Sequence, residues 1–328
     1  MTRTQPRPEV AWPDGKRFAF TIFDDTDGTT LLNGPPVYDA LTRHGLRITK
    51  SVWIDDTPQP SPVGGTSCAD ADYLAWVLEL QEAGHEIGFH NARDHPSTRL
   101  QTIAALDRFR SVFGHDPRIG ADHSHNLEAL YWGERRLTGW RSELYRRAMS
   151  ISRPHGDAFA GEVPDSPYFW ADVCRDRITY WRNFTFDRLN LLDVCPQLPY
   201  HDPRRPYVNW WFSGSDAPNL DRFVELVSPA NLDRLEQDGG ACIIYTHLGV
   251  GFAPDGRLDA RFVSAIEDIA GRDGWFAPAS DVLDVLRSHG GDHLLTDRQR
   301  SAMERRWIVD LVRSRGLTEV RRAARRLR

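Results

Sequence analysis

Carboxylates follow an apolar segment of the chain at the point where that segment ends. Asp24 and Asp25 close the run Phe18–Phe23, whose aromatic and β-branched side chains are typical of a strand buried on both faces. Such strands belong to parallel sheets, in which ligand sites lie beyond the carboxyl ends. Because successive strand residues point to opposite sides, one carboxylate can hold a cation while the other accepts a proton. A strand end followed by an Asx-type turn is the purely structural alternative.

Two histidines occupy the same kind of position. His90 follows the short strand expected at residues 86–89, and His123 follows the strand expected at residues 118–121. A carboxylate with neutral imidazoles is the ligand set of a hydrolytic zinc or iron site, where the cation lowers the pKa of water toward neutrality. Three strand ends with such residues therefore predict a site for one divalent metal ion.

The elements that would position these residues alternate between strand and helix. This rhythm is typical of a β/α barrel or a doubly wound sheet, and both architectures gather strand-end residues at one edge. The pattern is weak between residues 132 and 219. Predicted strands span residues 18–23, 48–54, 86–89, 118–121, 178–180, 191–194, 208–212, 241–246 and 275–276, and predicted helices span residues 37–44, 70–83, 97–113, 219–236, 259–270 and 279–288.

Composition excludes several classes of protein. The 328 residues carry a net charge of −5, which gives no electrostatic reason to expect a nucleic-acid partner. None of the four cysteines, Cys68, Cys174, Cys195 and Cys242, has Cys-x-x-Cys spacing, which argues against a thiolate zinc site or a disulfide scaffold. Residues 1–15 are proline-rich and lack the apolar segment of a secretory signal, and no apolar run is long enough to span a bilayer. We therefore expect a cytoplasmic protein.

Three regions follow from these patterns. We expect an N-terminal extension at residues 1–15, a barrel at residues 16–290, and an arginine-rich helical tail at residues 291–328. The tail is predicted either to contact a membrane surface or an acidic partner, or to be a solvated helix.

Three of these segments resemble motifs of a known family. Residues 23–25 (Phe-Asp-Asp), 84–90 (Gly-His-Glu-Ile-Gly-Phe-His) and 243–247 (Ile-Ile-Tyr-Thr-His) look like the first, second and last motifs of the polysaccharide deacetylases, also called the NodB-homology domain. They occur in the same order, and the resemblance extends over residues 16–288. It implies a distorted β/α barrel that binds one divalent metal, often zinc, and removes acetyl groups from N-acetyl or O-acetyl sugars.

The resemblance also implies roles for individual residues. Carried over, Asp24 is the general base, Asp25 and His90 are metal ligands, and His247 is the general acid that protonates the leaving amine.

Two departures from the family pattern concern the third metal ligand. The second motif of the family has another histidine four residues after the first, whereas here Asp94 stands at that place and His95 follows it. The arginine of the third motif is absent at the matching strand end, which reads Gly-Ala-Asp-His and ends in His123. We predict His123 as the third ligand in preference to His95, because a strand end is held more rigidly than a loop flanked by proline.

Three residues are candidates for substrate binding. Trp211 offers a flat apolar face for a sugar ring, with a place in the core as the alternative. Asp172 and Asp216 can bind substrate hydroxyls or cap loops.

The sequence as a whole predicts a zinc-dependent or similar hydrolase that deacetylates a sugar or a sugar-bearing precursor. Two alternatives stay open. One is hydrolysis of another carbon–nitrogen bond, such as that of a cyclic amide. The other is a carbohydrate-binding barrel without catalytic activity, which the altered second and third motifs would fit.

Overall fold

The computed structural model describes residues 9–152 and 159–326, with side chains described for 9–148 and 159–313. The first eight residues of the predicted N-terminal extension lie outside the described residues, and so do the side chains of the last arginines of the predicted tail.

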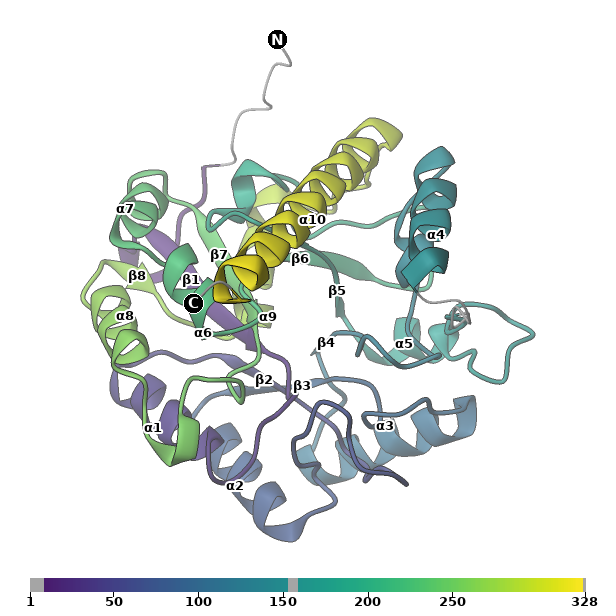
Figure 1. The fold of residues 1–328 in the computed structure, drawn as a ribbon, viewed down its shortest axis with the longest axis horizontal. Helices are drawn as coiled ribbons and strands as arrows, with labels where there is room; N and C mark the ends of the chain where they lie inside the picture. Colours follow the sequence, from purple (N-terminus) through teal and green to yellow (C-terminus); the bar gives the residue numbers. More distant parts are fainter. Residues whose placement is uncertain (1–8, 153–158, 327–328) are drawn as a thin grey trace.

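One parallel sheet closes into a barrel, which confirms the predicted β/α barrel (Figure 1). The strands lie in the order β2-β3-β4-β5-β6-β7-β1-β8, and β1 also pairs with β2 to complete the ring. Every residue of β1 is buried, as its unbroken apolar run predicts. The strands are β1 (Phe18–Asp24), β2 (Thr49–Val52), β3 (Glu86–Phe89), β4 (Ile119–Gly120), β5 (Tyr180–Phe186), β6 (Trp210–Asp216), β7 (Ala241–Thr246) and β8 (Gly274–Trp275).

Helices cover the outside of this barrel (Figure 1). Their ends follow local signals: the Asp70 carboxylate accepts a hydrogen bond from the Tyr73 amide at the start of α2, and Gly114, at φ 82°, ends α3. The helices are α1 (Gly34–Arg43), α2 (Ala71–Glu82), α3 (Arg99–Phe113), α4 (Trp140–Ser152), α5 (Ala171–Arg177), α6 (Leu220–Leu226), α7 (Pro229–Gln237), α8 (Ala260–Ala270), α9 (Ala279–Gly290) and α10 (Asp297–Arg326).

Several elements differ from the prediction: the strand predicted at residues 208–212 is β6, and α4 and α5 were not predicted. The helix predicted at residues 219–236 is two helices, α6 and α7. Pro229 is the first residue of α7, a position that favours proline, so a new helix begins there. The strand predicted at residues 191–194 is a short 3-10 helix, in which the Asn190 side chain accepts a hydrogen bond from the Leu192 amide. The strand predicted at residues 178–180 begins at Tyr180 and continues to Phe186.

A buried ion pair lies at the seam between β1 and β2. Asp24 and Lys50 are register partners there, and Lys50 Nζ lies 3.0 Å from Asp24 Oδ2 with both side chains fully buried. The Tyr38 hydroxyl donates to the same oxygen at 2.7 Å, and the Leu248 amide donates to Asp24 Oδ1 at 2.7 Å. Burial, the largest single effect, acts to lower the pKa of Lys50. The charge and the hydrogen bond of Asp24, with contributions from Tyr73 and Cys68, together outweigh burial and raise that pKa.

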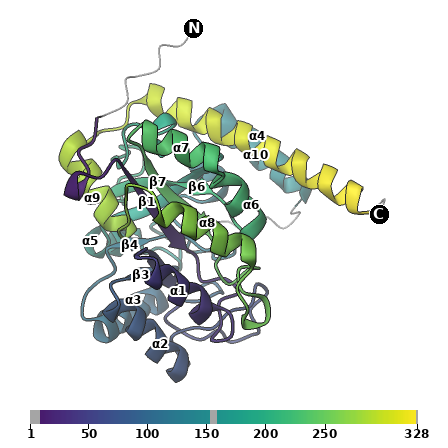
Figure 2. The same ribbon diagram turned by 90° about the vertical axis from the view of Figure 1, so that its left-hand side faces the viewer.

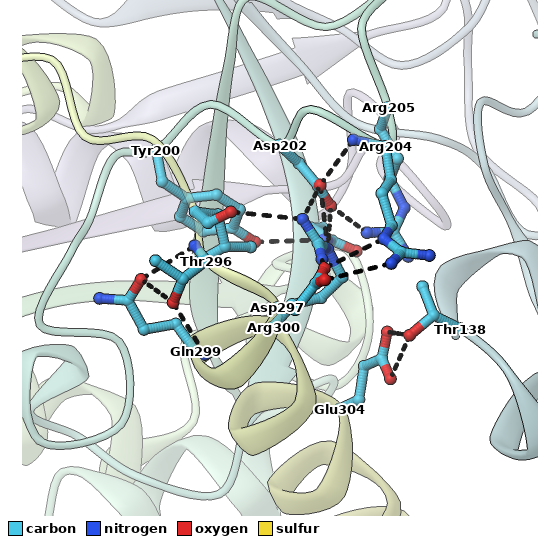
Figure 3. Close-up of polar contacts among 12 residues, drawn as sticks. Thr138, Tyr200, Asp202, Arg204, Arg205, Thr296, Asp297, Gln299, Arg300 and Glu304 are labelled. Carbon is cyan, nitrogen blue, oxygen red and sulfur yellow. Dashed lines mark hydrogen bonds and ion pairs between the residues drawn. The ribbon is translucent and has the colours of Figure 1, made fainter.

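The helix α10 is fixed to the barrel by buried polar contacts (Figure 3). Arg300 lies 2.6 Å from Asp202, and both side chains are almost completely buried. Glu304, also buried, accepts a hydrogen bond from the Thr138 hydroxyl at 2.9 Å. Figures 1 and 2 show α10 beside α4, crossing the β5 side of the barrel. The predicted tail is therefore packed against the barrel where its side chains are described.

Among the described residues, no helix combines the length and the apolar character that a membrane span requires.

We predict that Lys50→Met destabilises the protein by roughly 3–5 kcal/mol, because it leaves the Asp24 carboxylate buried without its counterion. Chemical denaturation followed by circular dichroism measures this loss. Adding Asp24→Asn to Lys50→Met should recover a large part of it, since no buried charge then remains unpaired.

The matched control is Lys16→Met, because Lys16 forms an ion pair with Asp273 in which both side chains are exposed. An exposed pair contributes about 0–1 kcal/mol. Equal losses in the two lysine variants would show that the seam does not depend on the buried pair.

Candidate active site

The alternation of side chains along β1 separates three carboxylates. The Asp25 amide donates to the Thr246 carbonyl at 2.9 Å, so Asp25 continues the pairing of β1 with β7. Asp24 points outward to Tyr38 of α1, whereas Asp25 and Asp27 line a pocket. The structure does not bring Asp24, the predicted general base, into this pocket, because its carboxylate is bound in the seam between β1 and β2.

The pocket lies at the carboxyl ends of the strands and has a volume of about 290 Å³. This size is near the lower limit for a small-molecule site. Five residues predicted from the sequence line it together: Asp25, His90, His123, Asp216 and His247.

Asp27 and two histidines form a cluster of metal-ligating atoms. One such atom from each of Asp27, His90 and His123 lies within 4.8 Å of the others. His90 Nε2 is 3.3 Å from Asp27 Oδ1, and His123 Nε2 is 3.5 Å from Asp27 Oδ2. Ligand atoms about 2.0–2.1 Å from a tetrahedral zinc ion are roughly 3.3 Å from one another. The spacing of the cluster therefore suits a small divalent cation.

The hydrogen bonds of the two imidazoles support the same conclusion. His90 Nδ1 lies 3.1 Å from the Ala121 carbonyl oxygen, which can only accept, so Nδ1 carries the proton. His123 Nδ1 lies 3.1 Å from Asn126 Oδ1 in the same way. Both Nε2 atoms, together with Asp27 Oδ1, are buried and have no hydrogen-bond partner within the described residues. Unpartnered buried lone pairs are costly, and a metal ion would satisfy all three.

Asp94 adds an oxygen donor at the same place. Its two carboxylate oxygens are buried without a hydrogen-bond partner among the described residues, and Oδ1 lies 3.3 Å from His123 Nε2. Asp94 thus stands beside the cluster at the sequence position where the family pattern has its second histidine.

Asp25 is held by an arginine rather than by the cluster. Arg182 on β5 donates two parallel hydrogen bonds to the Asp25 carboxylate, at 2.7 and 2.6 Å, and both residues are buried. Burial, the largest single effect, acts to raise the pKa of Asp25. The charge of Arg182, its hydrogen bonds and the charges of His90 and His247 together outweigh burial and hold that pKa below its usual value. Asp25 Oδ2 is still 3.8 Å from His90 Nε2. Asp25, predicted as a metal ligand, is therefore a neighbour of the cluster whose carboxylate Arg182 orients.

His247, predicted as the general acid, lies at the end of β7 and faces the pocket. Its Nδ1 donates to the Pro218 carbonyl at 2.8 Å. Its Nε2 lies 3.1 Å from the Tyr245 hydroxyl and 3.6 Å from Asp27 Oδ2. The Nδ1 hydrogen bond fixes the ring so that Nε2 points toward the cluster.

The remaining predicted residues have different surroundings. His95 does not belong to the cluster. Asp172 forms an ion pair with Arg99 at 2.6 Å and does not line the pocket, and Trp211 is 1% exposed in the core. Asp216 lines the pocket, and burial raises the pKa of its carboxyl group.

Several pocket residues escaped the sequence analysis. Asp27 lies in the turn after β1, two residues beyond Asp25, where strand periodicity gives no signal for its direction. Arg182 comes from the middle of the chain, where periodicity is weak. Arg136 and Trp307 also line the pocket. Trp307 comes from α10, which belongs to the segment predicted as an arginine-rich helical tail.

Comparison with solved structures finds proteins of the same fold. A protein from Mycobacterium smegmatis, assigned as a polysaccharide deacetylase, matches with a TM-score of 0.50 and 16% identity over 90% of this chain and 99% of that one. A protein from Pseudomonas aeruginosa PAO1 with the same assignment and the Puue allantoinase each match with a TM-score of 0.47 and 14% identity, over 87% of this chain and 95% of theirs. No family model matches the chain, and no curated protein matches its sequence. The Mycobacterium smegmatis protein shows that the chain has the fold of the polysaccharide deacetylases.

We predict that Asp27→Ala and His123→Ala each weaken zinc binding at least about tenfold, because even residues that only orient metal ligands contribute that much. Asp94→Ala should weaken it as well. Titration of the metal-free protein with zinc, followed by calorimetry, measures the three affinities.

His95→Ala is the matched control, since it removes an imidazole next to Asp94 that lies outside the cluster. It should leave the zinc affinity unchanged. A loss in His95→Ala equal to that in His123→Ala would identify His95 as a ligand instead.

Proposed function

We propose that the protein is a metal-dependent hydrolase that removes an acetyl group from an N-acetyl or O-acetyl sugar, or from a sugar-bearing precursor. The observation that carries the proposal is the joint presence, in one pocket, of the Asp27, His90 and His123 cluster, an arginine-bound Asp25 and His247. The fold shared with the polysaccharide deacetylases supports it.

The proposed metal site consists of Asp27, His90 and His123, with Asp94 as a further oxygen donor. A divalent cation, which we expect to be zinc, supplies Lewis-acid chemistry there: it polarises a carbonyl oxygen and makes water a stronger acid. The residues that would hold it fit this group because their lone pairs are buried and unpartnered within the described residues. Carboxylate and neutral imidazole are also the ligand types of catalytic zinc sites.

We assign the general base to Asp25 in place of Asp24. Attack of water on an amide carbonyl needs a proton acceptor next to the water. Asp25 is next to the cluster, and its bidentate pairing with Arg182 fixes the carboxylate and keeps it ionised. In the family pattern an arginine also orients the base, so the pairing with Arg182 supports this assignment.

We assign the general acid to His247, as the sequence predicts. Amide cleavage needs a proton donor, because an amine anion is a very poor leaving group. The Nε2 atom faces Asp27 across the pocket, while Nδ1 is fixed by the Pro218 carbonyl. With Nδ1 held by this carbonyl, His247 is placed to deliver a proton from Nε2 to the leaving nitrogen.

The two alternatives from the sequence differ from this proposal in the substrate that is hydrolysed, or in whether any substrate is hydrolysed. A hydrolase of another carbon–nitrogen bond would use the same groups on a cyclic amide, whereas a carbohydrate-binding barrel would bind acetylated sugars without turnover. Assays of the zinc-loaded protein with acetylated sugars and with cyclic amides separate the three.

The cytoplasmic location and the contact of the arginine-rich tail with a membrane surface stay predictions. The second of them depends mostly on arginines whose side chains lie outside the described part of the chain.

We predict that Asp25→Asn and His247→Ala each lower kcat by about 10²–10⁴-fold on a substrate that the parent protein deacetylates, because each removes one proton transfer. The pH profile of the parent should be bell-shaped, with a rising limb from the base and a falling limb from the acid. Steady-state kinetics on folded variants measures both effects.

Asp172→Asn is the control for a carboxylate outside the pocket and should leave kcat unchanged. Full activity in a folded Asp25→Asn protein would show that another residue is the general base.

A further inference from the structure

Arg136 presents a guanidinium group to the same pocket from the short 3-10 helix Gly133–Arg136. Its central carbon lies 3.4 Å from the ring centroid of Trp132 and 5.8 Å from that of Trp307. Trp307 is itself held by the ring of Tyr145, at 5.7 Å. The guanidinium is therefore positioned by aromatic contacts, which attract a cation without neutralising its charge.

No carboxylate forms an ion pair with Arg136 in the part of the chain that the structure describes. Four of the six aspartates that line the pocket accept hydrogen bonds from donors other than Arg136. These pairs are Asp25 with Arg182, Asp122 with Trp181, Asp187 with Arg222, and Asp310 with Arg306. Burial lowers the pKa of Arg136 to about 10, so the group is still a cation at neutral pH. A partly buried cation without a counterion is unfavourable, and a ligand anion would relieve this cost.

The fixed helix α10 keeps this cation in place. Trp307 lies one to two turns after Arg300 and Glu304, the two residues that anchor α10 to the barrel (Figure 3). An arginine stacked on an aromatic face keeps the edge of its guanidinium plane free for two parallel hydrogen bonds to a carboxylate or a phosphate.

We propose that Arg136 is a specificity-determining residue that binds an anionic group, a carboxylate or a phosphate, on the substrate of this pocket. This inference rests on the proposed function only in taking that substrate to be an acetylated sugar. The cation without a counterion is observed independently of the reaction.

The test measures binding by calorimetry to the full zinc-loaded chain carrying His247→Ala, which slows turnover and, unlike Asp25→Asn, leaves Asp25 in place to neutralise Arg182. One series contains N-acetylglucosamine, its 6-phosphate and N-acetylmuramic acid, so that phosphate and carboxylate are compared on one sugar skeleton. A second series contains benzyl alcohol, phenyl phosphate and benzoate, which carry the same anions without a sugar.

We expect at least one anionic sugar to bind about ten- to hundredfold more tightly than neutral N-acetylglucosamine, because a hydrogen bond to a charged group stabilises by that amount. Arg136→Gln should abolish this preference and leave the affinity for the neutral sugar unchanged. Arg136→Lys should retain part of it, since lysine keeps the charge but lacks the planar fork. The control is Arg257→Gln, which removes the same charge from an exposed site outside the pocket.

The outcomes distinguish this inference from the proposed function. Arg136-dependent binding of phenyl phosphate or benzoate without binding of any sugar would support the anion site and contradict the sugar substrate. Deacetylation of neutral sugars by the parent protein, without any preference of the variant for anions in either binding series, would overturn the inference and leave the proposed function standing. A preference that persists in Arg136→Gln would overturn it as well. If Arg136→Gln does not fold, the Arg136→Lys variant replaces it. A preference for anions that falls in Arg136→Lys supports the inference, and an unchanged preference contradicts it.

Discussion

The ion pair of Asp24 and Lys50 determines which side chains of β1 face outward at the point where the barrel closes. Because the pair is completely buried and lies in register across β1 and β2, the outward side of β1 is determined at Asp24. The alternation of side chains then sends Asp25 to the other side, toward the pocket that Asp27 also lines. A shift by one residue would exchange the two sets and bring Asp24 into the pocket in place of its neighbours. The arrangement of the candidate active site therefore depends on a contact that takes no part in the proposed chemistry.

Some charged and polar groups in the pocket are paired with other groups of the protein, and others are not. Arg182 satisfies Asp25, and Arg222 satisfies Asp187, so these pairs shape the wall without attracting a ligand. The lone pairs of the metal cluster and the guanidinium of Arg136 are the groups left for a ligand, within the part of the chain that is described. Leaving such groups unpaired costs stability, so a folded protein usually keeps them only where something else binds.

The sequence was informative where local patterns coincide with the barrel. The apolar run before Asp24 and the strand-end positions of His90, His123 and His247 indicated the fold and the edge of the sheet at which the pocket lies, because parallel strands gather their carboxyl ends. The sequence was less informative where the chemistry depends on contacts between residues that are far apart in the chain. Nothing near Asp24 indicates that Lys50 binds it, and this pairing moved the proposed base to Asp25. Arg182 belongs to a region rich in aromatic residues, whose strand begins at Tyr180 rather than ending there.

The position of α10 has a consequence for the order in which the protein becomes functional. Domains are synthesised and fold from the N-terminus onward, so all the barrel strands can pair before α10 has left the ribosome. Trp307, Asp310 and Leu311 of α10 nevertheless form part of the pocket wall, and the buried contact of Arg300 with Asp202 ties that wall to the barrel. A nascent chain that has completed its last strand thus still lacks part of the pocket wall. Synthesis of the last helix is the step that adds the missing wall of the pocket to a barrel whose strands have already paired.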